Sequence, residues 1–338
     1  RFSNLFSNNL MLLLFFISSL TMFMASLIAS LEYDLKKIIA FSTLSQLGMM
    51  MSILALGEEE LAFFHLLMHA LFKALLFMCA GSIIHSFGNC QDIRFMGALT
   101  NSIPLTSCFF NICNMALCGL PFLSGFYSKD LILEFMSTDF TNIYVYIIFY
   151  LSTGLTFMYS LRLVYYTLVK NFNGISYYFI NDTNKNMLVS MGGLIFLVIL
   201  FGSIVSWMIF STPKFICLPI FMKMMIMMMI LFGLMIGFIV LYFSYMDNSK
   251  FMKFYQISYF VVFLWNLKFL STIGLNYYTL LIGGKFYEMM DQGWSEYLGS
   301  QNLFLMMKKS TFVFQLIFIK NLKIFLSLLF IWVCLLII

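Results

Sequence analysis

The sequence predicts an all-α fold, a polytopic membrane helix bundle in which one helix is discontinuous. Hydrophobic residues make up 62% of the 338 residues, charged residues 10%, and the mean hydropathy is +0.96. A soluble domain carries about 25% charged residues, so most of this surface is unsuited to water. The chain also contains a series of apolar runs, and a spanning helix needs roughly 20 such residues. Lipid cannot satisfy an open backbone, so the spans are expected to be helical.

Charged and turn residues divide the chain into the expected spans. They are residues 10–31, 36–57, 61–86, 104–138 (interrupted), 141–169, 187–210, 224–246 and 321–338. Loop charge predicts their orientation. One side holds Lys36, Lys37, Arg94, Lys170, Lys185, Lys250 and Lys253, whereas the other holds only Lys214 and Lys223 with the acidic run Glu58, Glu59 and Glu60. By the positive-inside rule, the Lys-rich side faces a mitochondrial matrix or a bacterial cytoplasm.

The span 61–86 carries three basic residues where lipid should be. His65, His69 and Lys73 stand at i, i+4 and i+8, so they share one helix face in adjacent turns. Lys73 is at the middle of the span, where a charge is most costly and cannot easily reach the headgroups. Such residues usually face a bundle interior or a hydrated cavity and mark an ion path. The alternative is a polar cluster that only joins helices, but three basic groups on one face would repel one another.

The span 104–138 is predicted to break. Gly119, Pro121 and Gly125 lie inside its apolar pattern, and proline removes a backbone donor and clashes with the preceding turn. Broken helices at mid-membrane commonly build ion sites in transporters. Three ionisable residues follow the break, Lys129, Asp130 and Glu134. The alternative is a helix that ends at Gly119 and leaves Lys129 and Asp130 in a surface loop.

The span 36–57 contains a polar stripe whose meaning the sequence leaves open. Its members are Ser42, Thr43, Ser45 and Gln46. Hydroxyls and amides at this spacing either hydrate a channel or bond to neighbouring helices. Asp34, Lys36 and Lys37 precede the stripe and are expected at the matrix edge.

The sequence indicates neither a metal site nor a bound redox cofactor. Its seven cysteines lie mostly within apolar runs without a CxxC pair, which favours buried small hydrophobes over metal ligands. It has no GxGxxG in a βαβ context and no Cys₄ framework, so we expect no flavin, nicotinamide or iron–sulfur cluster on this chain.

Three segments together resemble a known family, the antiporter-like membrane subunits of respiratory complex I. They are DLKKIIAFSTLSQLG, HLLMHALFKALLFMCAGSIIH and GLPFLSGFYSKD, and the resemblance runs in order along the whole chain. It implies a proton path in the membrane plane, with His65, His69 and Lys73 as its central relay. Lys129 would be the terminal lysine near the exit, with Asp130 and Glu134 as acidic neighbours. The other residues expected to support the relay are Asp34, Lys37, Ser42 and Gln46. The family's earlier repeat has no match here, so the chain is expected to be the C-terminal part of its subunit.

The resemblance implies a proton-translocating subunit of NADH:ubiquinone oxidoreductase in the mitochondrial inner membrane. The flavin, iron–sulfur clusters and quinone would belong to partner subunits, so this chain would belong to the enzyme without doing redox chemistry. Its expected partners are other complex I membrane subunits, especially neighbouring antiporter-like ones, and phospholipids, cardiolipin among them; nucleic acid is not expected. The Phe- and Met-rich composition, with four Pro, resembles that of AT-rich mitochondrial genomes.

Two other functions remain open from the sequence. A subunit of the related multi-subunit Na⁺/H⁺ antiporters would share the helix with the two histidines and the broken helix. A purely structural anchor in a large assembly would need neither. Sodium-dependent proton flux would favour the first, and normal pumping after Lys73→Met would favour the second.

The C-terminal stretch differs from the bundle. We expect three parts: a transmembrane bundle over 1–249, an interfacial segment over 250–320 and a final span over 321–338. From Lys285 to Lys320, charged and apolar residues intermix without a clean span, which suits a helix lying in the interface plane. The resemblance implies a long lateral amphipathic helix on the matrix side. We interpret it as a clamp rather than a moving rod, since nothing in the sequence supplies two discrete states.

Overall fold

The computed structural model describes residues 5–138, 143–174, 180–182, 184–210, 212, 216–245, 255–263, 267 and 269–337. The chain divides into two compact units, Arg1–Trp265 and Asn266–Ile338. The described residues are mainly helical and form no strand; an isolated antiparallel bridge joins Asp34 to Asp92. The predicted domain boundary at residue 250 lies outside the described residues and stays a prediction.

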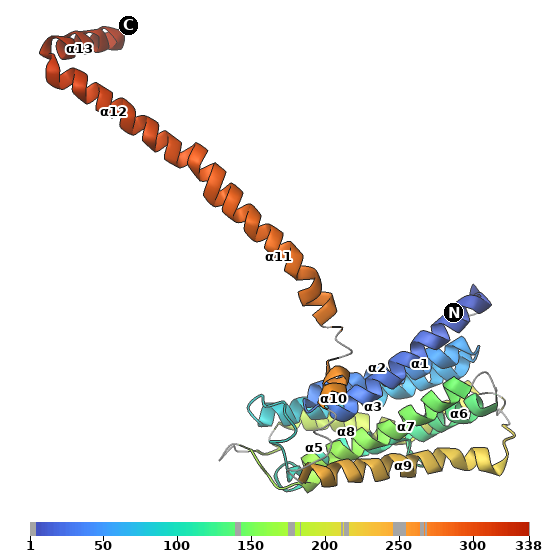
Figure 1. The fold of residues 1–338 in the computed structure, drawn as a ribbon. Helices are drawn as coiled ribbons and strands as arrows, with labels where there is room; N and C mark the ends of the chain where they lie inside the picture. The colour runs from blue at the N-terminus through green and yellow to red at the C-terminus, as the bar shows by residue number, and fades with distance from the viewer. Residues whose placement is uncertain are drawn as a thin grey trace. The chain divides into compact units, whose positions relative to one another are not determined.

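The first unit is a bundle of helices (Figure 1). Its helices are α1 (Asn8–Leu31), α2 (Leu35–Ala55), α3 (Glu59–Ser86), α4 (Leu99–Ser102), α5 (Pro104–Cys118), α6 (Ser124–Thr138), α7 (Ile143–Val164), the π-helical η2 (Tyr165–Val169), α8 (Lys185–Ile209), α9 (Ile220–Tyr245) and α10 (Tyr255–Val262). Each apolar run that the sequence predicts within this unit coincides with one or two of these helices. The predicted helix bundle with a discontinuous helix is therefore confirmed.

Helix α3 is central to the bundle. It packs against α2, α5, α6 and α8, while α1 lies along α2 and α7, and α7 lies along α9 (Figure 1). The apolar side chains of α3 fill the space between these helices, and Phe64, Met68 and Phe72 are at most 1% exposed. Because its neighbours surround it, any polar group on α3 that faces them is removed from both lipid and water.

The discontinuous helix is made of α5 and α6. Helix α5 is terminated by Gly119, the residue after Cys118, whose left-handed backbone (φ 80°) a residue with a side chain rarely adopts. Pro121 lies in the connection, and α6 resumes at Ser124. A Cβ on Gly125 would collide with the Ala116 carbonyl, so the two half-helices approach as closely as glycine allows. The alternative of a surface loop around Lys129 is wrong, since this residue is on α6 and 2% exposed.

The predicted grouping of the Lys-rich loops on one side agrees with the backbone hydrogen bonds between those loops. The bridge from Asp34 to Asp92 joins the start of α2 to the loop after α3, and Ala98 N–H donates to the Lys170 carbonyl at 2.8 Å. The Lys-rich connections around Arg94 and Lys170 therefore share one end of the bundle. Lys214, Lys250 and Lys253 lie outside the described residues.

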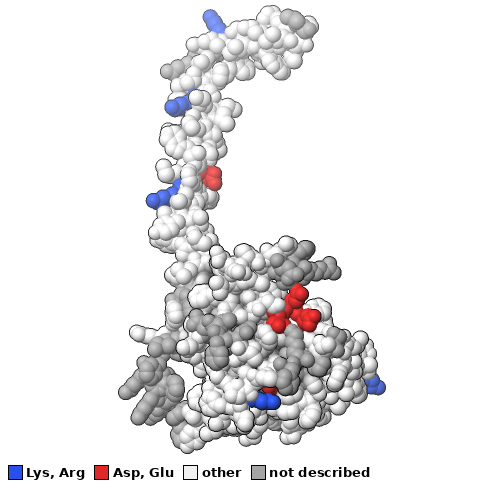
Figure 2. Space-filling view, turned by 90° about the vertical axis from the view of Figure 1, so that its right-hand side faces the viewer, with Lys and Arg blue, Asp and Glu red and all other residues white. Residues whose placement is uncertain are grey.

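The described helices are those of a multi-pass membrane protein. Seven of them are long and apolar enough to cross a membrane, judged by length and composition, and α5 and Leu322–Ile337 are shorter apolar helices. The face drawn in Figure 2 carries few charged side chains. A surface of this kind suits lipid as its surroundings.

The second unit is a long helical segment followed by a short apolar helix. Its parts are η4 (Phe269–Ile273), α11 (Gly274–Phe286), η5 (Tyr287–Ser295), η6 (Tyr297–Gln301), α12 (Asn302–Lys320) and α13 (Leu322–Ile337). Asn321 has extended backbone and separates the last two. The most apolar window of Phe269–Ile319 has a mean hydropathy of 1.3, compared with 1.4–2.8 for the other long candidates. The location of this segment in the interface stays a prediction.

Candidate functional site

The three basic residues of α3 are all buried. His65 is 1% exposed, His69 8% and Lys73 4%. The ring centroids of His65 and His69 are 6.3 Å apart, so the two imidazoles lie in successive turns. The Nε2 atom of His69 has no hydrogen-bond partner among the described residues. The spacing in the sequence thus produces a row of basic groups inside the protein.

The polar stripe of α2 faces this row. Lys73 Nζ donates a hydrogen bond to Ser42 Oγ, and His65 Nε2 lies 3.3 Å from Gln46 Oε1. Thr43, by contrast, bonds to the carbonyl of Ala40 at the exposed side of the same helix. Of the four members of the stripe, Ser42 and Gln46 contact the basic row, whereas Thr43 and Ser45 bond to carbonyls of their own helix.

Helix α6 contacts His65 from the other side. The Nδ1 atom of His65 lies 2.9 Å from Ser128 Oγ. In the neutral ring one nitrogen donates and the other accepts, and in the charged ring both donate. A hydroxyl can act in either sense, and the Gln46 carbonyl oxygen accepts in both states. The site can therefore hold His65 neutral or protonated with the same neighbours.

Lys129 is held where the broken helix exposes its backbone. Its Nζ donates to Thr156 Oγ1 on α7 at 2.9 Å and to the Leu117 carbonyl at 3.4 Å, and lies 5.5 Å from the centre of the Phe157 ring. The last carbonyls of a helix lack partners within it, and the end carries partial negative charge. The carboxyl end of α5 thus stabilises a cation at Lys129.

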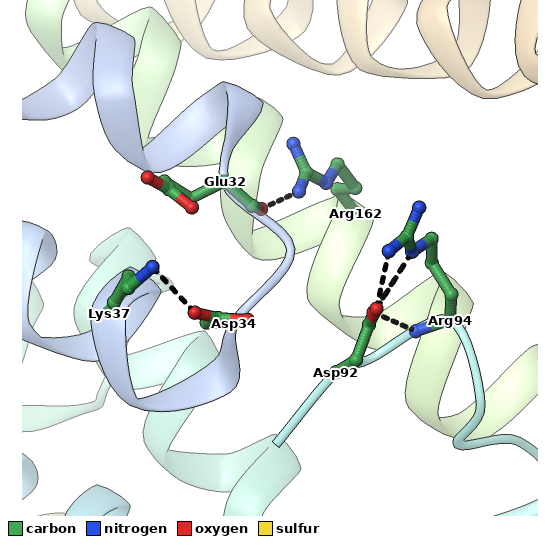
Figure 3. Close-up of polar contacts among 6 residues, drawn as sticks. All are labelled: Glu32, Asp34, Lys37, Asp92, Arg94 and Arg162. Atoms are coloured by element: carbon green, nitrogen blue, oxygen red, sulfur yellow. Dashed lines mark hydrogen bonds and ion pairs between the residues drawn. The ribbon is translucent and has the colours of Figure 1, made fainter. Parts of the chain in front are cut away.

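The remaining predicted acidic and supporting residues lie in two different places, on α6 and at the start of α2. Asp130 and Glu134 are half-buried on α6, and Asp130 directly follows Lys129. Asp34 and Lys37 form an ion pair of 2.7 Å whose side chains are 35% and 57% exposed, at the start of α2 (Figure 3). The structure therefore does not bring Asp34 and Lys37 into the buried row.

A second polar cluster, which sequence reasoning missed, lies at the Lys-rich end. Arg162 is 6% exposed and donates to the Ser30 carbonyl at the end of α1. It also donates to the carbonyl of Glu32, the next residue but one (Figure 3). Its guanidinium and that of Arg94 each lie 4.6 Å from the centre of the Tyr33 ring. These contacts satisfy the terminal carbonyls of α1 and fix the joint between α1 and α7.

Asp92 pairs with Arg94 in the loop after α3. Arg94 Nε lies 3.0 Å from Asp92 Oδ2, and the backbone N–H of Arg94 donates to Asp92 Oδ1 at 3.0 Å. Partial burial raises the pKa of the Asp92 carboxyl, but these hydrogen bonds outweigh it and hold the pKa below its ordinary value. The hydrogen bond to Asp92 likewise raises the pKa of Arg94.

Sequence reasoning also missed the partners on α7. Ser152, Thr156 and Ser160 recur every four residues, a spacing that lines one helix face and could have revealed them. Thr156 holds Lys129, and Ser160 Oγ lies 2.9 Å from the buried Cys118 thiol. The cysteines are free, and no group of three or more metal-binding side chains lies within the part of the chain that the structure describes.

A buried basic row beside a broken helix is typical of membrane proteins that transport ions. The family model described as "NADH:quinone oxidoreductase/Mrp antiporter, TM" matches residues 1–156. The model described as "NADH dehydrogenase subunit 5 C-terminus" matches residues 159–338. The chain belongs to the NADH dehydrogenase subunit 5 family.

The chain is also similar to proteins named NADH-ubiquinone oxidoreductase chain 5. NADH-ubiquinone oxidoreductase chain 5 of Aedes aegypti is 48% identical over 338 residues, covering 100% of this chain and 58% of that protein. Chain 5 of Anopheles quadrimaculatus is 49% identical over 94% of this chain and 55% of its own length. The chain thus spans little more than half the length of these relatives.

A solved structure shares the fold. It is the membrane-bound sulfane sulfur reductase, described as an archaeal respiratory membrane complex, with a TM-score of 0.53 and 26% identity. The likeness covers 57% of this chain and 32% of that one.

Proposed function

We propose that this chain is the C-terminal part of a proton-translocating subunit of NADH:ubiquinone oxidoreductase, in the mitochondrial inner membrane. One observation carries the proposal: His65, His69, Lys73 and Lys129 are all buried, and polar side chains of α2, α6 and α7 contact His65 and both lysines. Buried basic groups are costly in a membrane and usually serve transport.

The proposed path runs along α3 and crosses to α6. A proton on Lys73 passes to His69 and His65 in successive turns, and continues past Ser128 toward Lys129. The unpartnered Nε2 of His69 can take part through a water molecule, since it has no competing bond among the described residues. Ser42 and Thr156 suit both states of the lysines, because a hydroxyl accepts from an ammonium and donates to a neutral amine.

Electron transfer and its cofactors belong to partner subunits in this proposal. This chain binds no flavin, iron–sulfur cluster or quinone, and its part is to move protons when the assembled enzyme turns over. Its partners are the neighbouring membrane subunits of the complex and phospholipids, including cardiolipin.

The long helical segment over 269–320 serves as a clamp on those neighbouring subunits. Replacing part of it should weaken assembly and leave the proton-to-electron ratio of intact enzyme unchanged; a lower ratio would exclude a pure clamp.

The test is Lys73→Met in the assembled complex, reconstituted in vesicles, with protons moved per NADH oxidised as the measurement. The variant removes the titrating group and keeps a long apolar side chain. Lys185→Met is the matched control, because Lys185 is exposed at the start of α8. We expect fewer protons per NADH in Lys73→Met alone. A normal ratio in an intact complex would leave only the structural-anchor function.

The Na⁺/H⁺ antiporter is a second candidate. The description of the family model that matches residues 1–156 names both NADH:quinone oxidoreductases and Mrp antiporters. Proton flux that depends on sodium, measured with the full subunit alone in vesicles, would favour it. NADH-driven flux that is indifferent to sodium favours the respiratory enzyme.

A further inference from the structure

Tyr159 on α7 is a buried polar residue that the proposed path does not use. It is 1% exposed, and its side chain is the largest of the fully buried ones that the structure describes. Its hydroxyl lies beside the Ser42, Ser45 and Gln46 side chains of α2. Yet the hydroxyl has no hydrogen bond of ordinary length and angle to any described residue. A buried hydroxyl is rarely left without a partner, so one of these neighbours must serve it in some state of the protein.

Two of these neighbours, Ser42 and Gln46, already serve the two ends of the α3 row, whereas the third, Ser45, donates to the Ser42 carbonyl at 3.0 Å. Ser42 Oγ donates its proton to the Ile39 carbonyl at 2.7 Å and accepts from Lys73 Nζ, so one of its two lone pairs remains. Gln46 Oε1 accepts from His65 Nε2 and also keeps a lone pair. Tyr159 has a single proton to donate. It can therefore support the lysine pair or the histidine pair, but not both at once.

Whether Ser42 Oγ or Gln46 Oε1 is the better acceptor for the Tyr159 hydroxyl depends on which basic group of the α3 row is protonated. When Lys73 is an ammonium it binds Ser42 Oγ strongly, and an oxygen that already accepts a charged donor is a poorer acceptor for a second. The Tyr159 proton then favours Gln46. When the charge is on His65, the same reasoning applied to Gln46 directs the hydroxyl to Ser42. The other titratable group beside Tyr159 is the Cys118 thiol of α5, which is paired with Ser160.

We propose that Tyr159 is a positioning residue of the proton path, whose hydroxyl alternates between Gln46 Oε1 and Ser42 Oγ as the proton moves between Lys73 and His65. The inference rests on the proposed function and assigns it a residue on a helix outside the α3 row. The hydroxyl stabilises whichever pair does not hold the proton, Lys73 with Ser42 or His65 with Gln46. It thereby couples Lys73 to His65, which lie two helical turns apart on α3.

The test is Tyr159→Phe in the assembled complex, which keeps the ring and removes only the hydroxyl. Tyr166→Phe is the matched control, because Tyr166 follows on the same helical segment, is 7% exposed, and packs against Tyr33 through its ring. Lys73→Met is measured in parallel. The readouts are protons moved per NADH, the rate of proton translocation across a range of pH, and the amount of assembled complex.

We expect Tyr159→Phe to assemble normally and to slow proton translocation by about fivefold, the effect of losing one hydrogen bond of ordinary strength. We also expect its pH optimum to move, because the two pairs then titrate without the shared donor. Tyr166→Phe should change neither. A rate and pH optimum equal to those of the control, or a failure to assemble, would overturn the role of Tyr159. If Lys73→Met pumps normally, it is the proposed function that fails.

Discussion

The Nδ1 atom of His65 on α3 lies 2.9 Å from the hydroxyl of Ser128 on α6. Ser128 is followed directly by Lys129, whose Nζ is bonded to α7. One hydroxyl thus links the histidine in the middle of the bundle to the residue next to the lysine of the broken helix. The two sites that the sequence indicates separately lie on α3 and α6, which pack against each other.

Removing the Ser128 hydroxyl should interrupt this link. Ser128→Ala leaves Nδ1 of His65 without its partner, and a buried unpaired group costs about 1–3 kcal/mol. We expect a lower rate of proton translocation per assembled complex. Ser137→Ala on the same helix is the control, since the Ser137 hydroxyl bonds to the Glu134 carbonyl of its own helix at 2.6 Å. Equal rates in the two variants would contradict a role for Ser128.

The support of Lys129 by α7 can be tested with Thr156→Val. The change keeps the branched shape and removes the acceptor 2.9 Å from Lys129 Nζ, which leaves only the longer bond to the Leu117 carbonyl. Loss of a bond to a charged group costs about 1.5–3 kcal/mol, so translocation should slow by about tenfold or more. Thr153→Val is the control, because the Thr153 hydroxyl bonds to the Tyr150 carbonyl of its own helix. If both valine variants pump alike, Thr156 does not hold a functional cation.

The close approach of the two half-helices predicts a severe effect of Gly125→Ala. The added methyl would meet the Ala116 carbonyl, which is backbone and cannot turn aside. Overpacking of this kind typically costs about 1–3 kcal/mol, so the amount of assembled subunit and its thermal stability should both fall. Gly192→Ala on α8 is the control, since a Cβ there meets no atom within 4 Å. Normal stability of Gly125→Ala would show that α5 and α6 do not pack as described.

The loop after α3 should loosen in acid. The pKa of Asp92 is lowered in the folded protein, so its stabilising effect is present above the unfolded value of about 3.9 and is lost as pH falls through the folded value. Asp92→Asn should therefore exchange its loop amide hydrogens faster at neutral pH and show less further change in acid. The effect is small, about 1 kcal/mol or less, because the partner Arg94 is 55% exposed. Identical acid profiles in the two proteins would contradict the pairing.

The spans and the helix break could be predicted from the sequence because each has a strong physical cause. A membrane requires long apolar helices, and Gly119 and Pro121 interrupt one in a way that few other residues would. His65, His69 and Lys73 stood out for the same reason, since basic groups are rare in such spans.

The partners of these groups could not be predicted, because serine and threonine occur throughout apolar helices. They usually bond to a carbonyl of their own preceding turn, as both Ser42 and Thr156 do here. Which of them also meets a lysine depends on how the helices are rotated against each other. A supporting role is likewise what the sequence predicts for Asp34 and Lys37, whereas they pair with each other at the start of α2.

The most direct test of the proposed path is Lys129→Arg in the assembled enzyme, with protons moved per NADH oxidised as the measurement. Arginine keeps the positive charge at the carboxyl end of α5 but does not release a proton in proteins. Lys185→Arg, at an exposed position, controls for the substitution itself. The account predicts an assembled complex in which protons per NADH fall by the share that this subunit moves, with the control unchanged. An unchanged ratio in Lys129→Arg would remove Lys129 from the path and contradict the account.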